Sequence, residues 1–184
     1  MAETRKVAFF SVYHKSNNLV LIAREFVQRY DILATTGTAT YLKSSGINNV
    51  VDVAEYVGPA LLEHGVVTLH SGIHVALRAP YTPEGDAAIA KFDIPRIDAL
   101  CVEFYPPDVN RIDVGGPALL TSALNGRRPV VYVRSDDRIV PPSQRRSFAE
   151  MDLSDIRNRR YVLAILRGYY TALHEEAEIA LGRE

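Results

Sequence analysis

A chain of 184 residues with 47% hydrophobic and 23% charged residues has the composition of one globular domain with a sizeable core. Its formal net charge of −1 excludes the strongly basic surface that nucleic acids or acidic membranes attract. The single cysteine, Cys101, excludes a disulfide framework, and its apolar surroundings in the sequence indicate a core position. There is no signal-peptide pattern and no apolar run of about 20 residues, so we expect a cytoplasmic protein without a membrane partner.

Short apolar runs alternate with helical patterns in the first third of the chain. The apolar runs predict strands at residues 7–12, 31–34 and 50–53. Residues 17–30 carry apolar side chains at helical spacing and follow polar residues that suit a helix cap. A shorter helix is expected between Thr38 and Gly46.

The middle of the chain is less regular. Residues 58–79 are mixed, and the runs 66–69 and 73–77 are each compatible with an extended strand. Two helices are then predicted, at residues 83–92 and 116–125, the second of them ending at Gly126. Two further strands are predicted, at residues 99–104 and 130–133.

The C-terminal part differs in composition. Residues 135–153 are polar and contain Pro141-Pro142 and Arg145-Arg146, so they predict a linker or an exposed loop with a solvated basic pair. A long helix is expected from about Ser154 to Leu181. One apolar stripe on this helix predicts packing either against the domain or against a second subunit of a homodimer. The stripe comprises Val162, Leu166, Tyr169, Leu173, Ala177 and Ala180.

The alternation of strands and helices predicts an α/β fold, with a parallel sheet flanked by helices and a C-terminal helix. We divide the chain into a domain over residues 1–134, a linker or loop over 135–153 and a C-terminal helix over 154–184. Ligands of such sheets bind beyond the carboxyl ends of the strands. The polar turns of this chain are expected to lie at these ends.

Two of these turns suit an anion. Ser11 and Lys15 flank the first strand-to-helix turn, and residues 35–38, Thr-Thr-Gly-Thr, form the second. Hydroxyl groups, backbone N–H groups at helix N-termini and one ammonium group are the usual ligands of phosphate. Helix capping explains each turn alone, because serine and threonine are common caps. Two equivalent turns in adjacent units predict phosphate binding.

A third turn, residues 113–117, reads Asp-Val-Gly-Gly-Pro and joins a carboxylate to the start of a predicted helix. The proline suits the first turn of a helix. The glycines allow a close approach to the main chain, either by a packed neighbour or by a ligand. The residues of this turn do not decide between packing and ligand binding.

The motifs, taken in order, resemble those of a known family. They are Ser11-Val12-Tyr13-His14-Lys15, Thr35-Thr36-Gly37-Thr38-Ala39, Thr68-Leu69-His70 with His74, Phe104-Tyr105-Pro106, and Ile112-Asp113-Val114-Gly115-Gly116-Pro117. The chain resembles the IMP cyclohydrolase domain, the N-terminal half of the bifunctional purine-biosynthesis enzyme that also carries AICAR transformylase. The resemblance spans residues 7–133 and returns weakly in the last helix. It implies a stand-alone domain with a methylglyoxal-synthase-like fold.

The resemblance implies that the substrate is FAICAR, a phosphoribosylated formamido-imidazole carboxamide. The carboxamide nitrogen attacks the formyl carbon, water is lost, and IMP forms without a metal or a cofactor. The implied catalytic residues are Asp113, Tyr105 and Thr68. The implied substrate-binding residues are Ser11, Lys15, Thr35, Thr36, Gly37, Thr38, Leu69, Val114 and Gly115.

The chain departs from the family where the reaction needs positive charge. Gly65 and Val67 stand where the family has an arginine and a lysine, and Asn125 replaces a second lysine. Glu103 replaces a neutral asparagine. Because the loss of one donor to a reacting oxygen typically slows a reaction about 100- to 1,000-fold, other residues would have to substitute.

Glu103, His64 and His70 are candidates for such altered chemistry. A solvated acid at a strand end and a role toward a changed substrate both explain Glu103. His70 and His74 match histidines of the family, which favours inherited architecture. A metal on this pair is not expected, because carboxylate partners at useful spacing are lacking.

Three functions follow from these observations. The first is a divergent cyclohydrolase that closes the ring of FAICAR or of a related phosphoribosyl carboxamide. The second is a non-catalytic homologue that binds a phosphoribosylated ligand. The third, a lyase acting on a small phosphorylated sugar as methylglyoxal synthase does, is weaker, because that enzyme shares the Thr-Gly-Thr turn but not Asp-Val-Gly-Gly-Pro.

Overall fold

The computed structural model describes residues 5–60, 66–133, 153 and 155–182. Within these residues, five parallel strands form one sheet in the order β3-β2-β1-β4-β5. The strands are β1 (Lys6–Ser11), β2 (Tyr30–Ala34), β3 (Val50–Asp52), β4 (Ala99–Val102) and β5 (Val130–Tyr132). The predicted α/β fold with a parallel sheet is confirmed.

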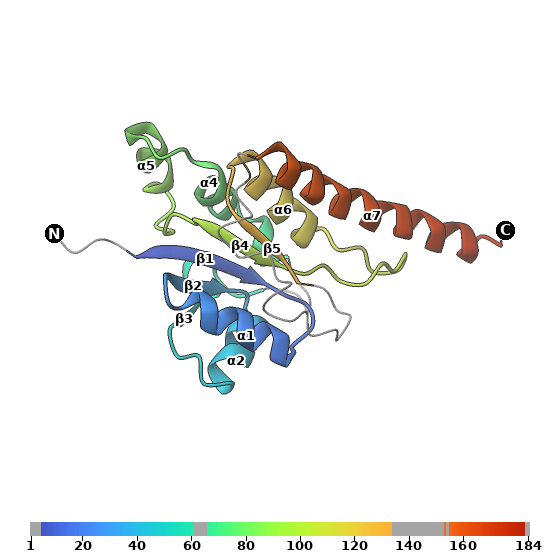
Figure 1. Cartoon of the computed structure of the whole chain (residues 1–184), viewed down its shortest axis with the longest axis horizontal. Helices are drawn as coiled ribbons and strands as arrows, with labels where there is room; N and C mark the ends of the chain where they lie inside the picture. Colours follow the sequence, from blue (N-terminus) through green and yellow to red (C-terminus); the bar gives the residue numbers. More distant parts are fainter. Residues whose placement is uncertain (1–4, 61–65, 134–152, 154, 183–184) are drawn as a thin grey trace.

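Helices cover both faces of this sheet (Figure 1). In the first half of the chain they are α1 (Asn17–Phe26), α2 (Thr36–Ser44), the short α3 (Ala54–Val57) and the 3-10 helix η1 (Val67–Leu69). In the second half they are α4 (Ser71–Arg78), α5 (Pro83–Ile89), α6 (Gly115–Asn125) and α7 (Ile156–Ala180). In Figure 1, α1 and α2 lie on one side of the sheet and α4, α6 and α7 on the other.

The core is divided between the two faces of the sheet. Phe9 packs with Leu100 in the cluster that also contains side chains of α4, α6 and α7. Phe10 packs with Cys101 in the cluster on the α1 and α2 side. Because both faces are covered, strands of such a sheet are continuous apolar runs, and β4 is buried along its whole length. The predicted core position of Cys101 is confirmed, since this side chain is fully buried.

The irregular middle of the chain is where the sequence prediction was wrong. Residues 73–77 belong to the helix α4 and not to a strand. Ile73, Ala76 and Leu77 are buried at helical spacing, and the Nδ1 atom of His70 accepts a hydrogen bond from the N–H of Gly72 to cap the helix. Residues 66–69 include the 3-10 turn η1, again not a strand.

The long C-terminal helix is confirmed as α7, and part of its apolar stripe packs on the domain. Val162, Tyr169 and Leu173 are buried in the core cluster of the α6 side. Farther along, Ala177 is half-buried and Ala180 is exposed, and Figure 1 shows this end of α7 extending beyond the sheet. The homodimer remains a prediction. The expected linker, residues 135–153, lies outside the described residues apart from the buried Leu153.

No helix among the described residues is long and apolar enough to cross a lipid bilayer.

Candidate functional site

Three of the polar turns meet at one edge of the sheet. The N–H of Glu103, just after β4, donates to the carbonyl of Ser11 at the end of β1 (3.0 Å). The N–H of Thr35, just after β2, donates to the carbonyl of Phe10 (3.0 Å). The carboxyl ends of β2, β1 and β4 are therefore adjacent, as expected for a ligand site in a parallel sheet.

Lys15 connects the first turn to the second. A Cβ atom built on Gly37 would lie 3.8 Å from the Cε atom of Lys15, so the lysine stem lies over the first turn of α2. The Nζ atom of Lys15 donates to the carbonyls of Val12 and Tyr13. Burial lowers the pKa of Lys15, and the charge of Glu103 partly opposes this shift.

The N-terminus of α2 has no side-chain cap. Thr35 occupies the cap position, but its hydroxyl donates to the Oγ1 atom of Thr38 (3.1 Å) instead of accepting from a backbone N–H group. Thr38 is fully buried, and its own hydroxyl donates to the carbonyl of Val12 (3.2 Å). The first-turn N–H groups of α2, together with the dipole of the helix, are thus arranged for an anion.

The sequence predicted two equivalent anion-binding turns, one before α1 and one before α2, but the caps of these two helices differ. Ser16 caps α1, because its hydroxyl oxygen accepts from the N–H of Leu19 (3.4 Å). The first turn therefore contributes Lys15 and half-buried Ser11, whereas α2 contributes the helix N-terminus. Thr36, at the start of α2, donates its hydroxyl to Oδ1 of Asp52 (3.0 Å), a residue that the sequence analysis did not select.

Asp113 is held by backbone groups on both of its oxygens. Oδ2 accepts from the N–H of Tyr105 (2.9 Å), and Oδ1 accepts from the N–H of Gly116 in the first turn of α6 (2.8 Å). The N–H of Asp113 itself donates to the hydroxyl of Tyr169 (2.7 Å). Because the carboxylate is buried and accepts two hydrogen bonds, its visible role is to fix Tyr105 beside the start of α6.

Close packing explains both glycines of the Asp-Val-Gly-Gly-Pro turn. A Cβ atom on Gly115 would lie 2.3 Å from the Oγ1 atom of Thr68. A Cβ atom on Gly116 would lie 2.6 Å from Cδ1 of Phe104 and 2.8 Å from Oδ2 of Asp113. Thr68, a predicted catalytic residue, is accordingly buried behind Gly115, while the predicted substrate-binding residues Leu69 and Val114 are exposed.

Of the two explanations for Glu103, a solvated acid at a strand end is wrong, because the side chain is buried. Only 3% of its side chain is exposed. Its Oε2 atom accepts from the N–H of His14 (2.6 Å), and its Oε1 atom lies 3.0 Å from the Nδ1 atom of the same histidine. Glu103 therefore holds the first turn through both the main chain and the side chain of His14.

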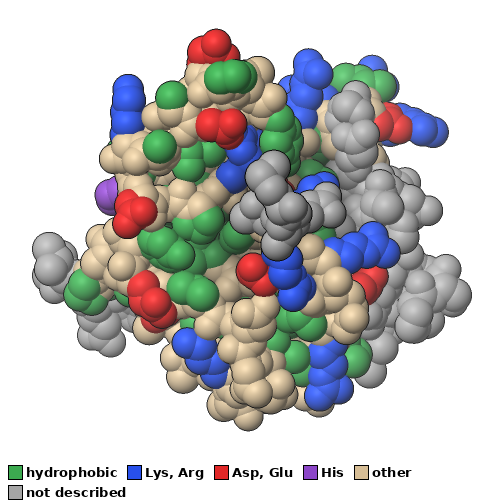
Figure 2. Space-filling model, turned by 90° about the vertical axis from the view of Figure 1, so that its left-hand side faces the viewer, with side chains coloured by type: hydrophobic (Ala, Val, Ile, Leu, Met, Phe, Trp, Pro, Cys, Tyr) green, Lys and Arg blue, Asp and Glu red, His purple; other side chains and the backbone are tan. Residues whose placement is uncertain are grey.

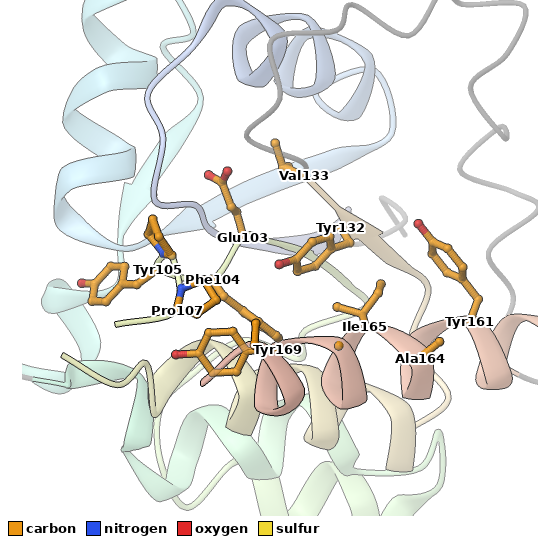
Figure 3. A pocket seen from close by; sticks show the side chains of 13 residues that line it. Glu103, Phe104, Tyr105, Pro107, Tyr132, Val133, Tyr161, Ala164, Ile165 and Tyr169 are labelled. Carbon is orange, nitrogen blue, oxygen red and sulfur yellow. The ribbon is translucent and has the colours of Figure 1, made fainter. Parts of the chain in front are cut away.

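A cavity of about 520 Å³ opens beside these residues, between the ends of β4 and β5 and the helix α7 (Figure 3). Its lining includes Glu103, Tyr105, Tyr132, Tyr161 and Tyr169. Burial raises the pKa of Tyr132 to about 12, so this phenol stays protonated near neutral pH. The aromatic lining and the carboxylate suit a small planar molecule with hydrogen-bonding groups.

The other predicted residues are dispersed. His70 caps α4 and is exposed, and the Nδ1 atom of His74 lies 2.8 Å from the Oγ atom of Ser122, so both histidines have structural roles. Burial lowers the pKa of His74. Within the described residues, no three His, Cys, Asp or Glu side chains gather in a way that could hold a metal ion.

Two of the positions at which the resemblance implies cations, Val67 and Asn125, lie within the described residues. Val67 is half-buried on η1, and Asn125 is exposed at the C-terminal end of α6. His64 and Gly65 lie outside the described residues. On the face of the molecule in Figure 2, positive and negative side chains are interspersed around a hydrophobic centre.

The comparisons with known proteins support the fold. No protein-family model matches the sequence. The crystal structure of ForH is similar to this chain, with a TM-score of 0.70 and 22% sequence identity over 95% of this chain and 97% of ForH. At this level of identity the likeness shows that the two proteins share a fold.

Three residues of the site were missed by the sequence analysis: His14, Asp52 and Tyr169. His14 was quoted only within a motif, and its partner Glu103 is 89 positions away. Asp52 is the last residue of β3, and an acidic residue at the carboxyl end of a predicted strand is a signal that could have selected it. Tyr169 was assigned to an apolar stripe, but its hydroxyl accepts a hydrogen bond from the Asp113 turn.

We expect the change Tyr169→Phe to lower the free energy of unfolding by about 1–3 kcal/mol, because the buried N–H of Asp113 loses its acceptor. Chemical denaturation followed by circular dichroism measures this loss. The matched control is Tyr170→Phe, which removes the same hydroxyl from an exposed neighbour on α7. Equal stability of the two variants would contradict the anchoring role of Tyr169.

Proposed function

We propose that this protein binds a phosphorylated small molecule at the carboxyl edge of its sheet, with the phosphate at the N-terminus of α2. The observation that carries the proposal is the position of Lys15 over Gly37, at a helix N-terminus that lacks a side-chain cap. An ammonium group close to the first-turn N–H groups of a helix favours the binding of an anion such as phosphate. Ser11, Thr35 and Thr36 lie in the same two turns and would bind the phosphate and the ribose, whereas the fully buried Thr38 would hold the turns together through Val12.

We further propose that the ligand is FAICAR or a related phosphoribosyl carboxamide, and that the protein is a cyclohydrolase that closes its ring with loss of water. The ordered motifs that resemble the IMP cyclohydrolase domain support this assignment. The aromatic cavity beside Glu103 and Tyr105 supports it as well, because it lies next to the proposed phosphate site. The reaction needs no metal or cofactor.

In this proposal Tyr105 is the residue that contacts the reacting oxygen, and Asp113 positions it. The carboxylate of Asp113 accepts the N–H of Tyr105, and the guanidinium carbon of Arg111 lies 4.5 Å from the centre of the Tyr105 ring. A guanidinium over an aromatic face is attracted to the ring, so Arg111 helps to hold the side chain of Tyr105 in place. We place the enzyme in the cytoplasm and propose a homodimer formed by the projecting part of α7.

A second candidate is a nucleotide-binding protein without catalysis. One observation favours it: both oxygens of Asp113 accept backbone N–H groups, so this carboxylate is already used by the fold. Val67 and Asn125, at positions where the family has lysines, add no compensating charge.

Incubation of the protein with FAICAR separates the two candidates, with IMP followed by absorbance and by chromatography. We expect IMP to form, and we expect Tyr105→Phe to lower the rate about 100-fold or more while the affinity for AICAR is retained. Tyr170→Phe is the matched control, and it should keep the full rate. AICAR binding without any IMP would favour the binding protein, and neither binding nor IMP would exclude both candidates.

A further inference from the structure

A buried carboxylate that lines the cavity, Glu103, holds a partly exposed histidine, His14, through two contacts. The side chain of Glu103 is 3% exposed, whereas that of His14 is 45% exposed. Glu103 accepts the backbone N–H of His14 on Oε2 (2.6 Å) and faces the Nδ1 atom of the ring with Oε1 (3.0 Å). These two contacts fix both the turn and the orientation of the imidazole.

The chemistry of the pair follows from its hydrogen bonds. An ionised glutamate can only accept hydrogen bonds, so the Nδ1 atom of His14 must carry a proton. In the neutral ring, Nε2 then holds the lone pair and can take up a proton. A carboxylate that orients an imidazole in this way also stabilises the imidazolium that proton transfer creates.

The surroundings place this histidine beside the other site residues. The ring of Tyr13 contacts the rings of both His14 (4.7 Å between centres) and Tyr105 (4.8 Å). Lys15, the proposed phosphate ligand, is the next residue in the chain. The charged groups around His14 are thus Glu103, just after β4, and Lys15 from its own turn, with Arg111 beyond the Tyr105 ring.

We infer that His14 is the proton-transfer residue of this site and that Glu103 is its positioning residue. The inference rests on the proposed ring closure. As the carboxamide nitrogen bonds to the formyl carbon, the C=O π electrons move to oxygen and one N–H proton passes to Nε2 of His14. His14 returns this proton to the same oxygen. The C–O bond then breaks and the hydroxyl takes up the proton of the formamido nitrogen, so that water leaves. The electrons of that N–H bond form the C=N bond, and the histidine ends the reaction as it began.

The first test is His14→Gln, since glutamine keeps an N–H donor for Glu103 but cannot accept a proton. We expect kcat for FAICAR to fall about 100- to 10,000-fold, with the Kd for AICAR close to that of the wild type. The wild-type pH–rate profile should have an ascending limb, because only the unprotonated ring is a base, and His14→Gln should lose it. His174→Gln, an exposed histidine on α7, is the matched control. Turnover and a pH profile unchanged in His14→Gln would overturn the inference.

The second test is Glu103→Gln, read by ¹⁵N NMR of the histidine rings. The amide would donate to Nδ1 and shift the ring proton of His14 to Nε2, which would remove the proton acceptor from the site. A tautomer that is unchanged in Glu103→Gln would overturn the positioning role of Glu103. If the wild type binds AICAR without making IMP, the proposed reaction fails. The proton-transfer role of His14 fails with it, whereas IMP formation that is unchanged in His14→Gln overturns this role alone. A protein that does not bind AICAR overturns both proposals.

Discussion

Replacing Lys15 with alanine is expected to weaken AICAR binding about 10- to 100-fold, the largest loss that we expect from any change in the proposed phosphate site. The reason is that a hydrogen bond to a charged group contributes about 1.5–3 kcal/mol, and about 1.4 kcal/mol corresponds to a factor of ten. The fold should survive, because the hydrogen bonds that Lys15 makes within the described residues go from Nζ to the backbone carbonyls of Val12 and Tyr13, close to it in the chain. Isothermal titration calorimetry with AICAR measures the loss.

The control for this change is Lys43→Ala. Lys43 is an exposed lysine in the last turn of α2, whereas Lys15 lies over the first turn of this helix. Lys43→Ala should leave the affinity for AICAR unchanged. Because burial lowers the pKa of Lys15, wild-type affinity should fall with rising pH earlier than an exposed lysine would allow. This fall should be absent in Lys15→Ala. An affinity for AICAR that is the same in Lys15→Ala and in the wild type would show that the phosphate site is wrong.

The sheet was predictable because each of its strands has a local signature. Both faces of the sheet are covered, so a strand such as β4 is a continuous apolar run that depends on no distant residue. The boundaries were less predictable. The helix expected over residues 17–30 ends at Phe26, and Tyr30, which fits its apolar spacing, instead starts β2. The apolar side chain of Tyr30 fits both the helical spacing and the following strand, and tertiary packing decides which of the two elements contains it.

Helix α4 was missed for a related reason. Ile73 and Val75 are β-branched, and the apolar run 73–77 is as short as a strand, so its local composition matches an extended segment. What makes it helical is its packing, since Ile73 and Leu77 are buried one turn apart in the same core cluster. Such short apolar runs cannot be assigned from their periodicity alone.

The site was predictable as a set of turns but not as a set of contacts. The sequence placed Ser11, Lys15 and residues 35–38 at strand ends, and the structure brings them together. It did not show that Glu103 has a partner inside the protein, because this partner, His14, comes 89 residues earlier in the chain. It also did not show that α1 is capped and α2 is not, because Thr35 and Ser16 are equally good caps until the hydrogen bonds are known.

The change Gly116→Ala distinguishes the two explanations that the sequence left open for the Asp-Val-Gly-Gly-Pro turn. We expect it to lower the free energy of unfolding by about 3 kcal/mol, the upper part of the usual range for overpacking. The new methyl group would meet Phe104 and the carboxylate of Asp113, neither of which can retreat freely. Phe104 is buried against Tyr132 and Tyr169, and Asp113 holds two backbone N–H groups.

The control is Gly168→Ala on α7, where a Cβ atom would have no neighbour within 4 Å. This change should raise the free energy of unfolding by up to about 1 kcal/mol, because alanine has a higher helix propensity than glycine. Thermal and chemical unfolding of both variants measure the difference. If Gly116→Ala kept its stability and lost only AICAR binding, the glycine would serve the ligand. A loss of stability without AICAR present would mean that close packing requires the glycine. The positions of Asp113 and Tyr105 would then follow from this packing.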